Sequence, residues 1–167
     1  MQFNQLTANQ LTANRCKQQL VACNINAQSV RNKTAVIFDY ICEHTPDLTT
    51  LTEHWLSDLD SSVRAELCPN GYKFLDHTRS DRRGGGTGII YHESLDVKKI
   101  DAGVSARSSY EFSEWLAKSG KYSIRIVIIY RPPYSERHPV TTNEFFAEFP
   151  DYLESLLLCK ERLLNHR

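Results

Sequence analysis

The sequence predicts a domain of the α/β class, in which mixed sheets are flanked by helices. The first observation is a strand, helix, strand order between residues 20 and 53. The second is a pair of neighbouring segments, 110–116 and 122–130, with the residue pattern of paired β-strands. The third is the helical spacing of apolar residues over 143–158. A chain of 167 residues is long enough for one such domain and short for two.

The first three elements bring two polar residues together. They are a strand over 20–25, a helix over 30–42 that cannot continue past Pro46, and a strand over 48–52. Strands joined by a helix usually lie parallel, so their carboxyl ends emerge at the same edge of the sheet. We therefore expect Asn26 and Glu53 to lie side by side, at the edge where ligand and metal sites collect.

The remaining elements follow from turn signals and alternation. In order, we predict a short helix or turn over 57–67, a turn over 68–71, strands over 72–75, 89–91 and 97–100, a hairpin of 110–116 with 122–130, and a helix over 143–158 that Pro150 can kink. Residues 1–18 contain a tandem Gln-Leu-Thr-Ala-Asn repeat, and we interpret them as a polar leader rather than a partner-binding tail. The domain then covers 19–160 and a tail covers 161–167.

Composition excludes several classes. Twenty Lys and Arg balance twenty Asp and Glu, so bulk charge does not favour nucleic acid and any basic surface must be local. Five cysteines with no Cys-x-x-Cys pair argue against a disulfide framework and a zinc site, and favour a reducing compartment. The N-terminus is polar and the chain has no apolar run of membrane-spanning length, so we expect neither secretion nor a membrane partner.

The most biased segment runs from Thr78 to Gly88 and is rich in arginine and glycine. It lacks the Gly-Lys-Ser/Thr ending of a phosphate-binding loop and precedes a strand, so we expect no nucleotide cofactor. Two interpretations stay open. The glycines permit close backbone approach to a DNA phosphate, aided by Arg79, Arg82 and Arg83, or they form a tight, solvated hairpin loop.

Glu53 also has two interpretations. A lone glutamate at a strand end normally faces solvent, whereas a carboxylate beside an asparagine offers the hard oxygen ligands that suit Mg²⁺. The six histidines of the chain show no metal-ligand spacing, and each is better explained as a surface or structural residue.

Four segments decide between these interpretations by resemblance. They are Asn26–Lys33, Leu51–Leu56, Arg83–Ile89 and Ile129–Pro133. In this order and spacing they resemble successive motifs of the endonuclease domain of LINE-type (non-LTR) retrotransposons. That domain belongs to the endonuclease/exonuclease/phosphatase superfamily, which has a DNase-I-like α/β sandwich fold. The resemblance extends from about Leu20 to Cys159.

The resemblance implies a role for each matching residue. Asn26 and Glu53 would form the catalytic metal site, and Tyr130 would contact the scissile phosphate. Arg83 would support the DNA-facing surface, with Arg79 and Arg82 from the same loop and Arg131 after Tyr130. The implied reaction is Mg²⁺-assisted hydrolysis of a DNA phosphodiester, with DNA as the partner and an intracellular, nuclear location.

The sequence also departs from that family. Its members continue into a strand ending Gly-Asp-Phe-Asn and later into a Ser-Asp-His segment, and the 167 residues contain neither. Each missing group typically costs about 10² to 10⁴ in rate, so we expect a C-terminally truncated domain with little or no nicking activity. We further expect an inner sheet face around Val127 and Ile129 to lack its covering strands. The alternatives are a non-catalytic remnant that binds DNA or protein, and a fragment with no selected function.

Overall fold

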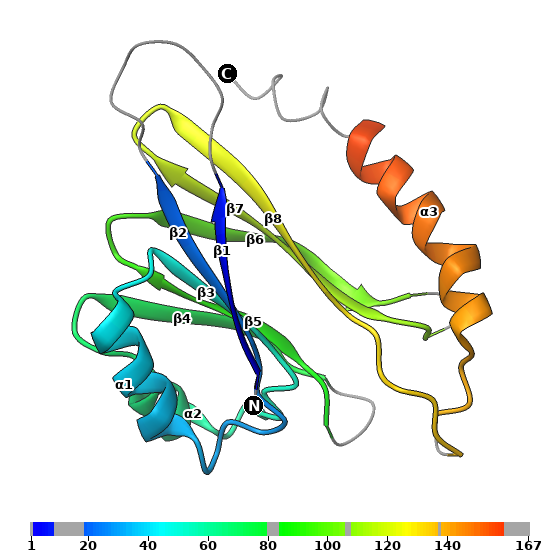
Figure 1. Ribbon diagram of the computed structural model, residues 1–167, viewed down its shortest axis with the longest axis horizontal. Coiled ribbons are helices and arrows are strands. Elements are labelled where there is room, and N and C mark those ends of the chain that lie inside the picture. The colour runs from blue at the N-terminus through cyan, green and yellow to red at the C-terminus, as the bar shows by residue number, and fades with distance from the viewer. Residues whose placement is uncertain (1, 9–18, 80–83, 106–107, 137, 159–167) are drawn as a thin grey trace.

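Two β-sheets packed face to face form the body of the protein (Figure 1). The computed structural model describes residues 2–8, 19–79, 84–105, 108–136 and 138–158. The strands are β1 (Gln2–Ala8), β2 (Leu20–Asn26), β3 (Leu48–Thr52), β4 (Tyr72–His77), β5 (Thr87–His92), β6 (Asp96–Val104), β7 (Glu111–Ser119) and β8 (Tyr122–Tyr130). The helices are α1 (Thr34–His44), α2 (Ser61–Glu66) and α3 (Thr142–Leu158).

The larger sheet is mixed, with strand order β1-β2-β3-β5-β4. The parallel pairing predicted for β2 and β3 is confirmed, with Ala22 opposite Leu48 and Asn26 opposite Thr52. The strands β4 and β5 pair antiparallel, and β5 pairs antiparallel with β3. The two parallel strands therefore end at the same edge, as the strand, helix, strand order requires.

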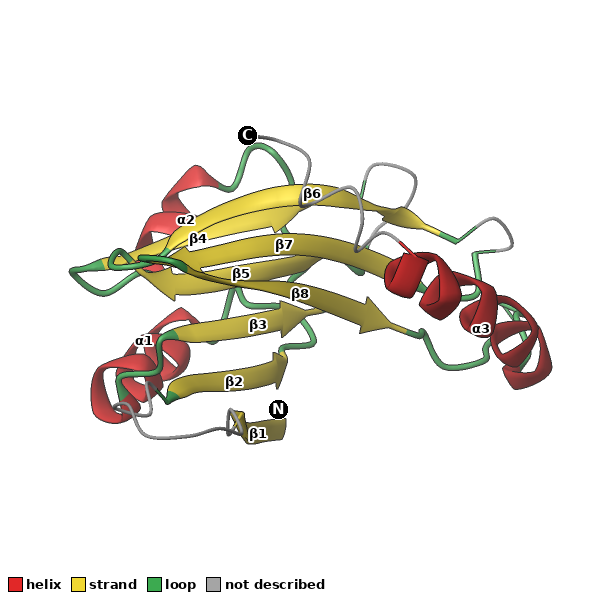
Figure 2. Cartoon of the chain, turned by 90° about the horizontal axis from the view of Figure 1, so that it is seen from above, coloured by secondary structure: helices red, strands yellow, loops and turns green. Residues whose placement is uncertain are grey.

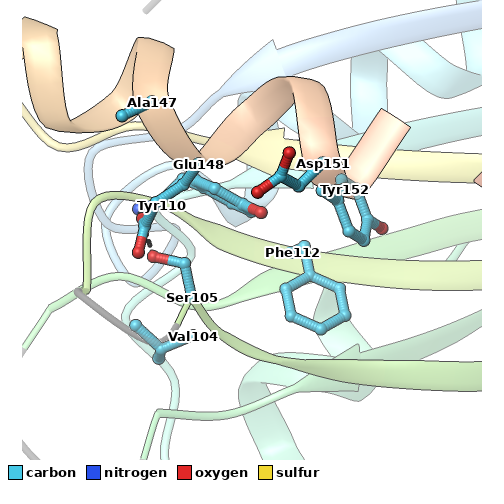
Figure 3. A pocket seen from close by; sticks show the side chains of 8 residues that line it. All are labelled: Val104, Ser105, Tyr110, Phe112, Ala147, Glu148, Asp151 and Tyr152. Atoms are coloured by element: carbon cyan, nitrogen blue, oxygen red, sulfur yellow. Dashed lines mark hydrogen bonds between the residues drawn. The ribbon is translucent and has the colours of Figure 1, made fainter. Parts of the chain in front are cut away.

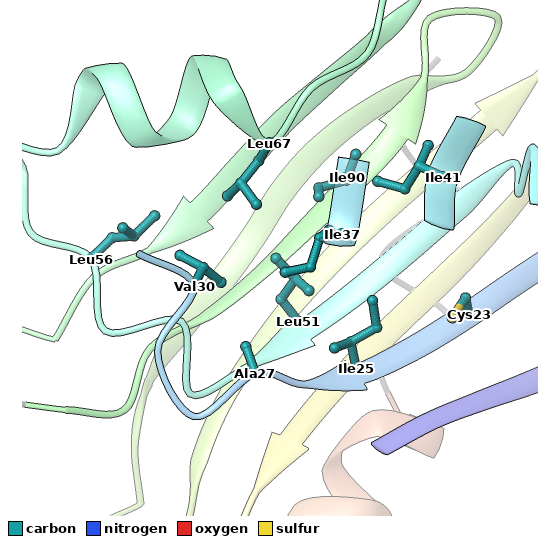
Figure 4. Packing of buried hydrophobic residues seen from close by; sticks show 10 residues of the cluster. All are labelled: Cys23, Ile25, Ala27, Val30, Ile37, Ile41, Leu51, Leu56, Leu67 and Ile90. Atoms are coloured by element: carbon teal, nitrogen blue, oxygen red, sulfur yellow. The ribbon is translucent and has the colours of Figure 1, made fainter. Parts of the chain in front are cut away.

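One face of the larger sheet is covered by α1. Ile25, Leu51 and Ile90 of the sheet pack with Ile37 and Ile41 of this helix, and all five side chains are fully buried (Figure 4). A β-sheet with one such apolar face needs a second layer to bury it. This cluster fixes the ends of β2 and β3 relative to the helix that joins them.

The other face of the larger sheet packs against the three-stranded sheet β6-β7-β8. Ile89 and Tyr91 of β5 meet Trp115 of β7 and Ile128 of β8 in a second apolar cluster. The predicted α/β sandwich with sheets flanked by helices is thus observed. The predicted hairpin is also present, because β7 and β8 pair antiparallel along their whole length.

The expectation for Val127 and Ile129 is wrong. Ile126 and Ile128 point into the cluster between the sheets, and side chains alternate along a strand, so Val127 and Ile129 lie on the outer face. Both are half-buried rather than exposed. The inner face of β8 is covered by the larger sheet.

Two N-terminal elements differ from expectation. Part of the predicted polar leader, Gln2–Ala8, pairs as strand β1 with the edge of β2. The backbone N–H and C=O groups at the edge of β2 can form hydrogen bonds with any extended segment. Polar side chains in that segment therefore do not prevent the pairing. Helix α1 begins at Thr34 rather than at Val30, because residues 31–33 form a turn and Lys33, the N-cap, has a non-helical φ of −135°.

Helix α3 lies at the end of the molecule away from α1 and α2 (Figure 2). Its start is fixed by a capping box, in which the Thr141 hydroxyl oxygen accepts from the Glu144 N–H and the Glu144 carboxylate accepts from the Thr141 N–H. Pro150 lies inside the helix, as predicted. In the described part of the chain, no helix is long and apolar enough to cross a membrane.

Candidate functional site

The carboxyl ends of β2 and β3 bring Asn26 and Glu53 into contact. The Asn26 side-chain Nδ2 donates a hydrogen bond of 3.0 Å to Oε1 of Glu53. The predicted adjacency of these two residues is therefore confirmed. The bond orients the amide and leaves the Oδ1 atom of Asn26 buried without a hydrogen-bond partner.

Backbone hydrogen bonds hold the two strand ends together. The Ala27 N–H donates to the Thr52 carbonyl at 2.9 Å, and the Ser29 N–H donates to the Glu53 carbonyl at 2.8 Å. Glu53 has a φ of 56°, in the left-handed region that a residue with a side chain rarely adopts. Such a conformation costs about 1 to 3 kcal/mol and persists only where its surroundings impose it. The surrounding structure therefore holds the backbone of Glu53 in a strained conformation.

Tyr130 reaches the same carboxylate from the other sheet. It is the last residue of β8, and its hydroxyl donates to the Glu53 carboxylate. Burial raises the pKa of Tyr130 above its ordinary value, and the hydrogen bond to Glu53 and the negative charges of Glu53 and Glu111 raise it further. The phenol therefore stays protonated and acts as a hydrogen-bond donor.

Glu111 is a further site residue, which sequence reasoning missed. It is 4% exposed and stands directly opposite Tyr130 in the pairing of β7 with β8. Its Oε2 accepts from the Gly86 N–H at 2.8 Å, and its Oε1 accepts from Arg79 Nη1 at 2.5 Å. The alternation of side chains along the strand could have revealed it. Glu111 is four residues before Trp115, so both side chains point to the same face of the sheet.

The glycine segment, Gly84–Gly88, is packed inside the protein from Gly85 onward rather than solvated. A Cβ on Gly85 would lie 2.4 Å from Oε1 of Glu111, and one on Gly86 would lie 2.5 Å from the His54 ring. These glycines therefore allow the backbone to approach two buried side chains. His54 is itself fully buried, and this burial lowers its pKa below the ordinary value. Its Nδ1 accepts from the Leu56 N–H at 3.0 Å.

Of the four predicted DNA-binding arginines, the structure describes Arg79 and Arg131, and both contact other parts of the protein. Arg79 is only 7% exposed and forms an ion pair with Glu111 instead of facing outward. Arg131 donates to the Thr142 hydroxyl at 2.7 Å and lies over the Phe145 ring, so it joins β8 to α3. Arg82 and Arg83 lie outside the described residues. Contact of these arginines with DNA stays a prediction.

The side chains present fit part of a Mg²⁺ site. The buried, unpartnered Oδ1 of Asn26 and the carboxylate of Glu53 are both oxygen donors of the type that Mg²⁺ prefers. No group of three or more His, Cys, Asp and Glu gathers as metal ligands among the residues that the structure describes. Mg²⁺ is usually bound by one or two carboxylates together with water and phosphate, so two protein donors suit it better than a closed cage would.

A cavity of about 520 Å³ lies elsewhere, between α3 and the ends of β6 and β7 (Figure 3). Its walls are Val104, Ser105, Tyr110, Phe112, Ala147, Glu148, Asp151 and Tyr152. None of Asn26, Glu53 and Tyr130 lines it. The candidate site is therefore separate from this cavity.

Comparison with solved structures identifies the fold. TDP2 from Caenorhabditis elegans matches with a TM-score of 0.58 at 16% identity, over 83% of this chain and 42% of that one. The human Nocturnin catalytic domain matches with a TM-score of 0.55 at 12% identity, over 84% of this chain and 58% of that one. The AP endonuclease LMAP from Leishmania major matches with a TM-score of 0.51 at 17% identity, over 66% of this chain and 39% of that one.

The chain has a DNase-I-like fold. It spans between 39% and 58% of the length of these three structures, and identities this low show the fold alone. No family model and no curated protein matches the sequence.

Proposed function

We propose that the chain carries the first half of the active site of a metal-dependent DNA endonuclease of the LINE type. The observation that supports this most is that Asn26 and Tyr130 both donate hydrogen bonds to the carboxylate of Glu53. The three residues lie at the ends of three different strands, which belong to two sheets. Glu53 lies at the carboxyl end of a strand of the larger sheet, and the unpartnered amide oxygen of Asn26 lies beside it. In a DNase-I-like fold, this pair of oxygen donors suits metal-assisted phosphodiester hydrolysis.

Each residue has a separate role in this proposal. Glu53 and Asn26 would hold Mg²⁺, which when bound neutralises charge on the phosphate and on the leaving oxygen. Tyr130 keeps its proton and donates to an anionic oxygen, either that of Glu53 or that of a bound phosphate. The hydrogen bond from Asn26 fixes the rotamer of the Glu53 side chain. These residues bind and orient a phosphodiester, and they supply no base to activate water.

The proposal includes little or no nicking activity for the 167 residues by themselves. They contain no Gly-Asp-Phe-Asn and no Ser-Asp-His motif, so the groups that bind the nucleophile are not supplied by this chain. The retrotransposon origin rests on the order of the four motifs, and a nuclear location would follow from a DNA substrate.

A plasmid-nicking assay tests the activity. The purified chain with Mg²⁺ is expected to leave supercoiled DNA intact, at the level of the EDTA control. Nicking in Mg²⁺ that EDTA abolishes, and that Glu53→Ala removes, would show that the chain is active and that its catalytic groups are complete.

The same preparation tests the non-catalytic alternative, in which the chain binds DNA without a metal role. That alternative predicts salt-dependent DNA binding that is lost on combined Arg82→Ala and Arg83→Ala substitution, with Mg²⁺ having no effect. Our proposal predicts instead that DNA binding strengthens when Mg²⁺ is added and that Glu53→Gln removes this increase.

A further inference from the structure

The contact between Glu53 and Tyr130 depends on how the two sheets are placed. Glu53 follows β3 of the five-stranded sheet, whereas Tyr130 ends β8 of the three-stranded sheet. In the part of the chain that the structure describes, no backbone hydrogen-bond ladder joins these sheets, so other contacts must fix their separation at this edge. A site built from both sheets therefore needs a bridge between them.

The glycine segment forms that bridge. On one side, the Gly85 carbonyl accepts from the Trp55 N–H at 3.0 Å, two residues after Glu53. On the other side, the Gly86 N–H donates to the Glu111 carboxylate at 2.8 Å. The same few backbone atoms thus contact the segment that carries Glu53 and the strand that faces Tyr130.

Glu111 is seated closely on this backbone. The position that a Cβ of Gly85 would take is only 2.4 Å from Oε1 of Glu111, so a side chain at Gly85 would displace the carboxylate. Arg79 balances the charge of the carboxylate by an ion pair in which both side chains are at least nine-tenths buried. A buried carboxylate without such a cation would be strongly disfavoured.

Resting on the proposed function, we propose that Glu111 and Arg79 are positioning residues, whose buried ion pair clamps the glycine segment between the sheets so that Tyr130 meets Glu53. They act through the geometry of Tyr130 and touch no substrate in this scheme. Their charges also act on the Tyr130 phenol, since Glu111 raises its pKa and Arg79 lowers it.

The chain offers a matched control on the same strand. Glu114 of β7 is 3% exposed, is paired with Arg125 and accepts a hydrogen bond of 2.6 Å from the Tyr152 hydroxyl. Like Glu111 it is buried and paired with an arginine, but its other partner is a tyrosine hydroxyl and it lies in the opposite phase of the strand, toward α3. Substitution of Glu114 therefore reproduces the loss of a buried, paired carboxylate away from Glu53.

The test compares Glu111→Gln with Glu114→Gln by NMR of isotope-labelled tyrosine rings, assigned with Tyr130→Phe and Tyr152→Phe. We expect Glu111→Gln to move the Tyr130 resonance and leave Tyr152 in place, and Glu114→Gln to do the reverse. Circular dichroism checks that both variants fold. An unchanged Tyr130 resonance in Glu111→Gln, or an equal change in Glu114→Gln, would overturn the proposal.

A second variant keeps the test decisive if Glu111→Gln does not fold. Arg79→Lys retains the charge and loses the planar fork that pairs with a carboxylate. It is expected to move the Tyr130 resonance in the same selective way, and a Tyr130 resonance identical to wild type would overturn the proposal.

Mn²⁺ affinity separates this inference from the proposed function. Outer partners of metal ligands typically change metal affinity by about 10- to 100-fold, so Glu111→Gln should weaken Mn²⁺ binding by about tenfold and Glu114→Gln should not. If the wild-type chain binds no Mn²⁺ at all, the proposed function fails. The tyrosine spectra still decide whether Glu111 positions Tyr130.

Discussion

Two acidic side chains define the candidate site: Glu53 is half-buried at the end of β3, and Glu111 is buried on β7. The contact of Asn26 with Glu53 was predictable, because parallel strands joined by a helix must end at one edge. Glu111 was not, because an acidic residue in a strand normally faces water and only the buried Arg79 makes an inward position acceptable. Local pattern thus locates residues near strand ends, whereas a buried ion pair depends on two segments far apart in the sequence.

Gly86 gives a prediction about the packing of the glycine segment. A Cβ at this position would lie 2.5 Å from the buried His54 ring, at a φ of 85°. We expect Gly86→Ala to lower the free energy of unfolding by more than about 2 kcal/mol, from both steric overlap and backbone strain. Chemical denaturation measures the change.

Gly120 provides the control for that substitution. Its φ is 56°, also left-handed, but nothing lies within 4 Å of the added Cβ. Gly120→Ala should therefore cost about 1 kcal/mol, from the backbone alone. Equal losses of stability for the two variants would contradict the close packing of Gly86 on His54.

His54 gives a pH dependence of stability. Burial holds its folded-state pKa below the ordinary value of about 6.5, so the unfolded chain takes up a proton first as the pH falls. The stability contribution is complete above about pH 6.5 and is lost as the pH decreases toward the folded-state pKa, by at most about 1.4 kcal/mol per pH unit.

The measurement is the free energy of unfolding between about pH 7 and 5 in wild type and His54→Gln. We expect the variant to lose a large part of the slope. An equal slope for wild type and His54→Gln would show that His54 does not titrate as its burial requires.

Among the elements, those with strong periodicity were predicted and those without it were not. The hairpin of β7 and β8 and the helix α3 follow from alternation and helical spacing over long segments. Strand β1 was missed because Gln2–Ala8 has little apolar alternation and is paired through its backbone. The late start of α1 was missed because the turn over 31–33 that precedes it leaves no mark in an apolar pattern.

Helix α3 carries an exposed apolar stripe that leads to a prediction about association. Phe146, Leu153 and Leu157 are 63%, 42% and 69% exposed, and with Pro150 they follow one face of the helix. Contiguous exposed apolar surface favours association. We expect Phe146→Glu with Leu157→Glu to make the chain more soluble and more monomeric, as measured by sedimentation velocity.

The control adds the same charge elsewhere. Val36 and Leu59 are also exposed, at 54% and 92%, and lie outside α3. Val36→Glu with Leu59→Glu should change association less than the α3 pair. If both pairs of substitutions improve solubility equally, net charge rather than the α3 stripe controls association.

The whole molecule is a two-sheet sandwich whose candidate site is formed by residues brought together from both sheets. Four motifs in order predicted this arrangement, and the match to solved structures confirms a DNase-I-like fold. The motifs could not reveal what fixes the position of one sheet relative to the other. In our proposal, that position depends on the packing of the glycine segment on Glu111. The central claim is that Asn26 and Glu53 form a divalent-metal site.

Paramagnetic NMR with Mn²⁺ tests that claim most directly. Mn²⁺ should selectively broaden the backbone amide signals of Ala27 and His54, next to the two ligands, and EDTA should restore them. Glu53→Gln should weaken binding by more than about tenfold, while Glu93→Gln, at an exposed position, should bind as wild type does. Broadening spread over surface carboxylates, or equal Mn²⁺ affinity for wild type and Glu53→Gln, would contradict the claim.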